Sequence, residues 1–232
     1  LGLPPSEENT DYDRSRLMPE ETPDVTGTLP GTIIHAVLAT LPSWYQADGT
    51  VDTLAHETLI SRTLLEHDLP ATHPAAERIR RETLAVARHP FLAEKAAFLD
   101  GAKFEYPFHL YAGRDYLLGS VDVLIPDANG ALEIWDWKTN IVTSAFEMYR
   151  LFERYRLQLE VYAWFLARLR PEQQRITARL LFTRLADKAN TAEGWIQTLQ
   201  VERSELPRIE AKIHSIMDEI RRVSYGNSLT ER

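Results

Sequence analysis

The stretch YLLGSVDVLIPDANGALEIWDWKT, residues 116–139, decides the fold of this chain. Two runs rich in apolar and aromatic residues, 116–126 and 131–139, flank a segment that begins at Asp127 and ends at Gly130. Clusters of Asp, Asn and Gly favour tight turns, and runs of this composition favour strands. The pattern therefore predicts a β-hairpin that carries acidic residues on both of its strands.

The register of this hairpin decides whether its two aspartates, Asp122 and Asp136, meet. A two-residue loop would place them on opposite faces of the sheet, because successive strand residues point to alternate faces. A three-residue loop, 128–130, would place them directly opposite each other. Three-residue loops commonly end in a left-handed residue, and Gly130 stands at that position. We therefore predict the three-residue loop, with Gly130 at positive φ and the two carboxylates facing each other.

Two facing carboxylates followed by a lysine favour metal-assisted chemistry. Adjacent carboxylates repel each other and a cation relieves the repulsion, and oxygen ligands suit Mg²⁺ or Mn²⁺. Asp136 and Lys138 share a strand face, so the lysine could contact a water or a phosphate at the metal. A strand Asp followed by Lys is also common on solvated faces. Here, however, both aspartates lie within apolar runs, where an acid needs a partner or a metal, and the combination predicts phosphodiester hydrolysis.

Patterns along the rest of the chain predict an α/β fold. The expected order is helices, three strands, a helix, two strands and a final helix, which suits an α/β or α+β sandwich around a mixed sheet. The predicted strands are 103–111, 116–126, 131–139, 176–185 and 194–201. The first predicted helix begins near Gly31, and the others cover 53–68, 74–88, 91–98, 145–170 and 204–223.

The domain organisation follows from composition. Residues 1–30 are rich in Pro, Glu, Asp and Thr, and we interpret them as a linker or wrapping arm. Residues 31–232 are expected to form one domain, with a helical part at 31–100 and a sheet core with its C-terminal helix at 101–232.

Composition and charge exclude several function classes. The chain has no cysteine, which excludes disulfides, thiolate zinc sites and a four-cysteine iron–sulphur cluster. No apolar run is long enough to cross a bilayer, so we expect a cytoplasmic protein without a membrane partner. The formal net charge of −8 lacks the basic footprint of a freestanding duplex-binding protein. It favours a module that receives nucleic acid from a neighbouring domain or a partner.

Four short motifs carry a family resemblance: GTIIH at 31–35, GSVD at 119–122, DWKT at 136–139 and QLEVY at 158–162. In the same order they are similar to the G-T-x-x-H, G-x-x-D, D-x-K and Q-x-x-x-Y patterns of RecB-family PD-(D/E)xK nuclease domains. Such a domain stands at the C-terminus of AddA- and RecB-like (UvrD/Rep-type) helicase–nucleases. The resemblance implies a restriction-endonuclease-like core, which is a central mixed β-sheet flanked by helices, with an N-terminal helical region.

The resemblance also implies roles for individual residues. The implied metal ligands are His35, Asp122, Asp136 and the main-chain carbonyl of Trp137. Lys138 would position or activate the attacking water, Gln158 and Tyr162 would hold DNA or support the site, and Glu105 would have a supporting catalytic role. Without the resemblance, His35 would be interpreted as a surface or core histidine, and the pair Gln158 and Tyr162 as packing.

As a function, the resemblance implies a Mg²⁺- or Mn²⁺-dependent deoxyribonuclease of the exonuclease V type that acts on single-stranded DNA ends. Its implied partners are a helicase domain of the same chain and a second helicase–nuclease subunit, in double-strand-break end processing; residues 1–30 would then be the remains of a linker. The lack of cysteine disfavours relatives with an iron–sulphur staple. Two alternatives stay open: a catalytically silent scaffold domain that guides DNA, and a stand-alone structure-specific endonuclease. The presence of Asp122, Asp136 and Lys138 favours an active enzyme.

Overall fold

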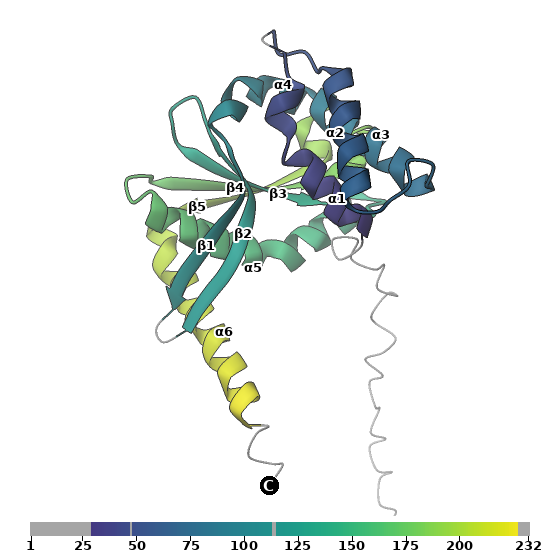
Figure 1. Ribbon diagram of the computed structural model, residues 1–232. Helices are drawn as coiled ribbons and strands as arrows, with labels where there is room; N and C mark the ends of the chain where they lie inside the picture. Colours follow the sequence, from purple (N-terminus) through teal and green to yellow (C-terminus); the bar gives the residue numbers. More distant parts are fainter. Residues whose placement is uncertain (1–28, 47, 113–114, 227–232) are drawn as a thin grey trace, which may run out of the picture.

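The computed structural model describes residues 29–46, 48–112 and 115–226, and it confirms the α/β class and the N-terminal helical region (Figure 1). A five-stranded mixed sheet stands at the centre, with helices packed on both of its faces. The linker or arm predicted for 1–30 lies outside the described residues up to position 28, and the first helix begins at Leu29.

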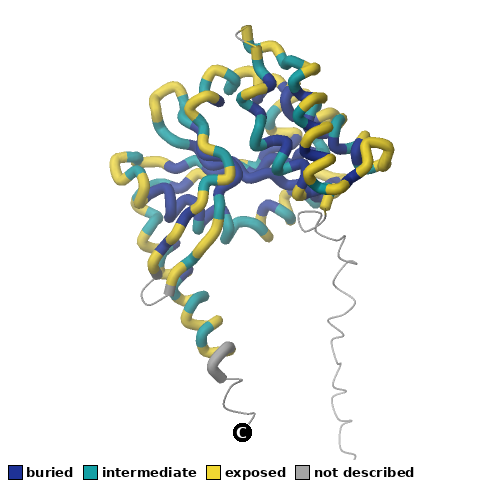
Figure 2. The backbone as a smooth tube through the Cα atoms, viewed as in Figure 1, coloured by how far each residue is buried: buried dark blue, intermediate teal, exposed yellow. Residues whose placement is uncertain are grey.

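The strands follow one another across the sheet in chain order. They are β1 (Lys103–Ala112), β2 (Asp115–Pro126), β3 (Leu132–Lys138), β4 (Arg175–Phe182) and β5 (Ile196–Glu202). β3 and β4 pair in parallel, and the other neighbours pair antiparallel. β3 is buried at every position but its first (Figure 2), because helices cover both of its faces; that explains its nearly continuous run of large side chains.

Helices from the two halves of the chain cover different faces. On one face, residues of the first four helices share a core cluster with Trp135 and Trp137 of β3, and on the other, residues of the last two share a cluster with Ile134 and Leu180. The helices are α1 (Leu29–Leu38), α2 (Thr53–Glu66), α3 (Pro74–Arg88), α4 (Pro90–Lys95), α5 (Ala145–Leu169) and α6 (Leu206–Gly226), with short 3₁₀ helices η3 (Leu41–Trp44), η4 (Ala96–Gly101), η5 (Thr183–Leu185), η6 (Ala192–Gly194) and η7 (Arg203–Glu205). Within the described parts of the chain, none of these helices has the length and apolar character needed to cross a bilayer.

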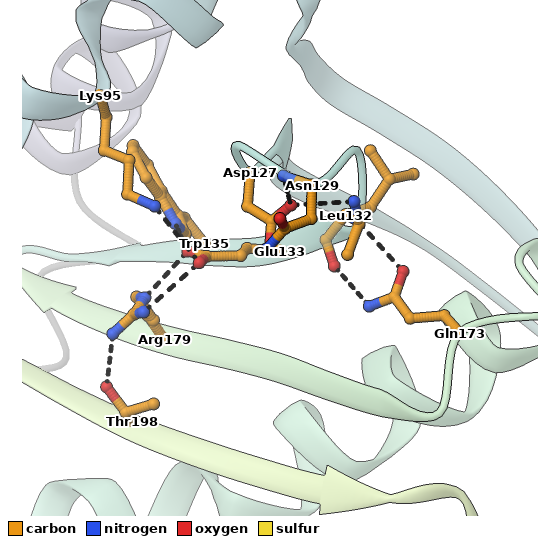
Figure 3. A network of polar contacts seen from close by, with 10 residues as sticks. Lys95, Asp127, Asn129, Leu132, Glu133, Trp135, Gln173, Arg179 and Thr198 are labelled. Carbon is orange, nitrogen blue, oxygen red and sulfur yellow. Dashed lines mark hydrogen bonds and ion pairs between the residues drawn. The ribbon is translucent and has the colours of Figure 1, made fainter.

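The hairpin turn has the predicted geometry. The Asp127 amide donates to the Ala131 carbonyl at 2.7 Å, and the Gly130 amide donates to the Asp127 carbonyl at 3.0 Å, which closes a three-residue loop. Gly130 has φ +77°. The Asp127 carboxylate accepts from the Asn129 and Ala131 amides at 2.7 and 2.9 Å (Figure 3). This turn gives the register Val123↔Trp135, which confirms the three-residue loop.

Two sets of partly buried polar contacts secure the same end of β3. The Gln173 side chain accepts from the Leu132 amide at 3.0 Å and donates to the Leu132 carbonyl at 2.9 Å (Figure 3). Glu133 accepts from Arg179 at 3.0 Å and lies 3.3 Å from Lys95 Nζ. Burial opposes the charge of Glu133, but Arg179 and Lys95 outweigh it and lower its pKa. A slip of β3 by one residue would break all these contacts, so they fix its register.

We predict that Gly130→Ala lowers the free energy of unfolding by about 1 kcal/mol, because an L side chain disfavours a left-handed backbone. A Cβ at this position would meet no atom within 4 Å, so the effect is conformational rather than steric. Gly130→Asn is the matched variant: asparagine tolerates this region, and its loss should be smaller. Urea unfolding of the three proteins measures the difference, and an Ala variant as stable as the parent would contradict it.

Candidate active site

Three acidic residues lie in a row across β1, β2 and β3. The β1–β2 register places Glu105 beside Asp122. The β2–β3 register, continued by one pair beyond Val123↔Trp135, places Asp136 on the other side of Asp122. Opposite residues of antiparallel strands share a face, so the β2–β3 hairpin places Asp122 and Asp136 on one face of the sheet, with Glu105 of β1 beside Asp122.

The hairpin opens at this row. No strand pairing joins Asp122 to Asp136; instead the Trp137 amide donates to Asp122 Oδ2 at 2.7 Å. Glu105 interrupts the ladder on the other side, and its φ of +47° lies in the left-handed region. A non-glycine residue in that region costs about 1–2 kcal/mol, and such strained residues cluster at functional sites.

His35 of α1 completes a group of three possible metal ligands. Its Nδ1 lies 3.5 Å from Asp122 Oδ2, and its Nε2 is buried without a hydrogen-bond partner among the described residues. His35, Glu105 and Asp122 each offer one ligand atom, and these atoms all lie within 4.8 Å of one another. A surface pocket lined by Thr32, His35, Ala36 and Glu105 reaches this group.

The chemistry of these donors fits a divalent cation. Two adjacent carboxylates supply the oxygen ligands that suit Mg²⁺ and Mn²⁺, and one imidazole adds a nitrogen donor. Burial and the neighbouring Asp122 raise the pKa of Glu105. Burial alone would lower the pKa of His35, but Asp122 and the other acids raise it above its usual 6.5. A cation among these groups would relieve the repulsion between the carboxylates, so the described residues fit the metal.

Asp136 and Lys138 form a buried ion pair beside that group. Lys138 Nζ lies 2.6 Å from Asp136 Oδ2, and both side chains are almost fully buried. Burial raises the pKa of Asp136, and the charge of Asp122 adds to the rise while Lys138 opposes it. Lys138 is therefore the main group that keeps the Asp136 carboxylate ionised in the metal-free protein.

Helix α5 holds the lysine from the other side. Lys138 Nζ donates to Gln158 Oε1 at 3.0 Å and lies 4.1 Å from the centre of the Tyr155 ring. Gln158 Nε2 in turn donates to the Tyr162 hydroxyl at 2.8 Å. The Tyr155 hydroxyl reaches Asn140 Oδ1 at 3.4 Å. These contacts fix the position of the ammonium group between the sheet and the helix.

The structure brings the predicted residues together, with one difference in their grouping. Glu105, which the sequence suggests only as a supporting residue, lies with His35 and Asp122, whereas Asp136 faces Lys138. Trp137 contacts the site through its amide, and a ligand role for its carbonyl stays a prediction, as does each assigned role. Glu105 groups with His35 and Asp122 because its backbone has a positive φ, which strand alternation does not anticipate.

Sequence reasoning missed two residues around the lysine. Tyr155 lies three residues before Gln158 and seven before Tyr162, so helical spacing puts all three on one face of α5. That spacing was a usable signal. Asn140, which contacts Tyr155, follows β3 in an irregular segment, and no spacing pattern points to it.

Residues 12–230 match the model of the PD-(D/E)XK nuclease superfamily. The match therefore covers all of the described structure and every residue of the site. No curated protein matches the chain.

We predict that Asp122→Asn and Glu105→Gln each weaken Mn²⁺ binding by at least about tenfold, since losing even a group that only orients a ligand has that effect. Titration calorimetry of the metal-free protein measures the affinity. Glu94→Gln, an exposed carboxylate of α4, is the matched control and should bind like the parent. Unchanged binding by both site variants would contradict the assignment of this group.

Metal affinity should also depend on pH. The raised pKa values of His35 and Glu105 keep these groups protonated at acidic pH, and a metal must displace those protons. We therefore expect the apparent Mn²⁺ affinity to rise from about pH 6 to about pH 8, with proton release on binding. Calorimetry in two buffers of different ionisation enthalpy detects the released protons. His35→Gln should release fewer protons, whereas His109→Gln, an exposed residue of β1, should match the parent.

Proposed function

We propose that this chain, which belongs to the PD-(D/E)XK nuclease superfamily, is a divalent-metal-dependent deoxyribonuclease that hydrolyses phosphodiester bonds. One observation carries the proposal: a group of possible metal ligands, His35, Glu105 and Asp122, lies beside the buried pair Asp136 and Lys138. Carboxylates that hold a metal, next to a fixed cation, are what phosphodiester hydrolysis requires.

The proposed metal is Mg²⁺ or Mn²⁺. His35, Glu105 and Asp122 would hold it, with Asp136 and the Trp137 carbonyl as the further ligands that the family resemblance implies. When bound, such a cation supplies charge stabilisation at the phosphate and lowers the pKa of water. The proposed catalytic residues of the chain are Asp122, Asp136, Lys138 and Glu105.

Lys138 acts on the reacting phosphate and water in this proposal. Its ammonium group has three donors and no lone pair, and two of these donors face acceptors, on Asp136 and Gln158. One N–H is left for a phosphate oxygen or a water. Gln158 and Tyr162 orient the lysine, so we place them as positioning residues that border the DNA.

The finer assignment is an exonuclease that acts on single-stranded ends beside a helicase in double-strand-break processing. Its support is the resemblance of the four motifs to RecB- and AddA-like domains, together with the net charge of −8, which suits a module that receives DNA from a helicase. A structure-specific endonuclease and a silent scaffold domain are the competing assignments. The complete set of Asp122, Asp136 and Lys138 disfavours the scaffold.

Incubation of the purified chain with single-stranded DNA and Mg²⁺ or Mn²⁺ tests the proposal. Metal-dependent degradation of linear DNA, with circular DNA left intact, is the expected result. Cleavage of both forms would support the endonuclease instead. Linear DNA that stays intact with either metal would refute the exonuclease assignment.

We predict that Lys138→Ala lowers the cleavage rate by about a hundredfold to a thousandfold, the usual effect of removing one group that stabilises charge in the transition state. Mn²⁺ affinity should change little, because the lysine is not a ligand. Asp136→Ala should reduce both cleavage and metal affinity. Lys103→Ala, an exposed lysine at the start of β1, is the matched control. Cleavage at the parental rate by Lys138→Ala would show that the lysine has no part in the reaction.

A further inference from the structure

A second cavity, of about 190 Å³, lies beyond the end of β3, between α3 and η5. We call it the arginine pocket. Its charged lining residues are Arg78, Arg81, Arg184 and Lys188, against Glu82 and Asp187. Four cations and two carboxylates leave an excess of two positive charges, in a chain whose formal net charge is −8.

Buried donors in the arginine pocket lack acceptors. The Nε and Nη2 atoms of Arg78 and the Nε atom of Arg184 are buried, and none has a hydrogen-bond partner among the described residues. Native proteins rarely leave buried donors unpaired, and a charged donor has the strongest need for an acceptor. These atoms therefore indicate a ligand rich in acceptor oxygens.

The carboxylate nearest to these donors does not satisfy them. Glu82 is buried and accepts a hydrogen bond from the Thr183 hydroxyl, while Arg78 Nε stays 3.9 Å from its other oxygen. Burial raises the pKa of Glu82. Burial lowers the pKa of Arg184, and Arg78 contributes to the lowering while Glu82 opposes it. Positive charge in the arginine pocket is thus left in excess, and an added anion would relieve it.

The arginine pocket adjoins the proposed catalytic lysine. The Thr183 hydroxyl that contacts Glu82 also lies 3.3 Å from the main-chain carbonyl of Lys138. Ile141, which lines the pocket, follows Lys138 by three residues, a span of at most about 11 Å even in a fully extended chain. A strand of nucleic acid at Lys138 could therefore place a neighbouring phosphate in the pocket.

We infer that the arginine pocket binds a phosphate group of the nucleic-acid strand next to the bond that is cleaved. The inference rests on the proposed nuclease function and names a second contact for its substrate. Guanidinium groups present paired donors that match phosphate oxygens. The ligand phosphate can be internal to the strand or at its end, because both offer the same oxygens. The pocket also explains how an acidic chain holds a polyanion: its positive charge is concentrated where the strand must pass.

Binding of a fluorescent single-stranded oligonucleotide in metal-free buffer tests the inference without cleavage. We expect Arg184→Gln to weaken binding by about tenfold or more, as for the loss of a hydrogen bond to a charged group, and to reduce the salt slope by about one. Arg81→Gln, at an exposed position, should weaken binding in the same direction without disturbing packing. Arg208→Gln, an exposed arginine of α6, is the matched control and should bind like the parent.

Two further measurements separate the sources of the phosphate and exclude a purely structural role. Oligonucleotides with and without terminal phosphates assign the ligand: an equal loss on both indicates an internal phosphate, and a loss only on the phosphorylated strand indicates a terminal one. Inorganic phosphate should raise the melting temperature of the parent and of Arg208→Gln, but not of Arg184→Gln. Parental affinity in both pocket variants would overturn the inference, as would destabilised variants with an unchanged response to phosphate. If the parent binds DNA through the pocket but never cleaves it, only the nuclease proposal fails.

Discussion

Hydrogen bonds within one turn determine which residues of β2 and β3 face each other, and the rest of the site depends on that pairing. The Asp127 side chain and the left-handed Gly130 close the loop. The loop fixes every residue pair between β2 and β3, from Pro126↔Leu132 to Val123↔Trp135, and so places Asp122 beside Asp136. With one residue more or fewer, Asp136 would point into the tryptophan-rich core under α1, and no pair of carboxylates would exist.

The same arrangement concentrates unfavourable electrostatics. Glu105 is held with a left-handed backbone beside Asp122, and Asp136 is buried with Lys138 as its main counter-ion. None of these features stabilises the metal-free chain, because buried like charges repel each other and buried ions lose hydration. A cation and a phosphate bound as proposed would offset these costs, and the phosphate would also give acceptors to the Arg78 donors that lack partners among the described residues.

Local signals in the sequence were enough to predict the hairpin, its register and the helices, because turn chemistry and alternation act over a few residues. The motifs also anticipated that His35 would reach Asp122. The grouping of Glu105 with them could not be predicted, since it depends on a backbone angle that alternation does not describe. The arginine pocket could not be predicted from the sequence either. α3 and η5 lie about a hundred residues apart in sequence, and only the tertiary fold shows that their arginines share a cavity.

The parallel pairing of β3 with β4 affects when the site can appear during folding. Parallel neighbours need a crossover, here α5, so β3 becomes a central strand only after the chain has passed through that helix and returned. The ammonium group of Lys138 can take its place only once α5 is present, because Gln158 of that helix, 20 residues further along the chain, accepts its hydrogen bond. A partly synthesised chain that ends before α5 would therefore carry the acidic hairpin without the contact that positions Lys138.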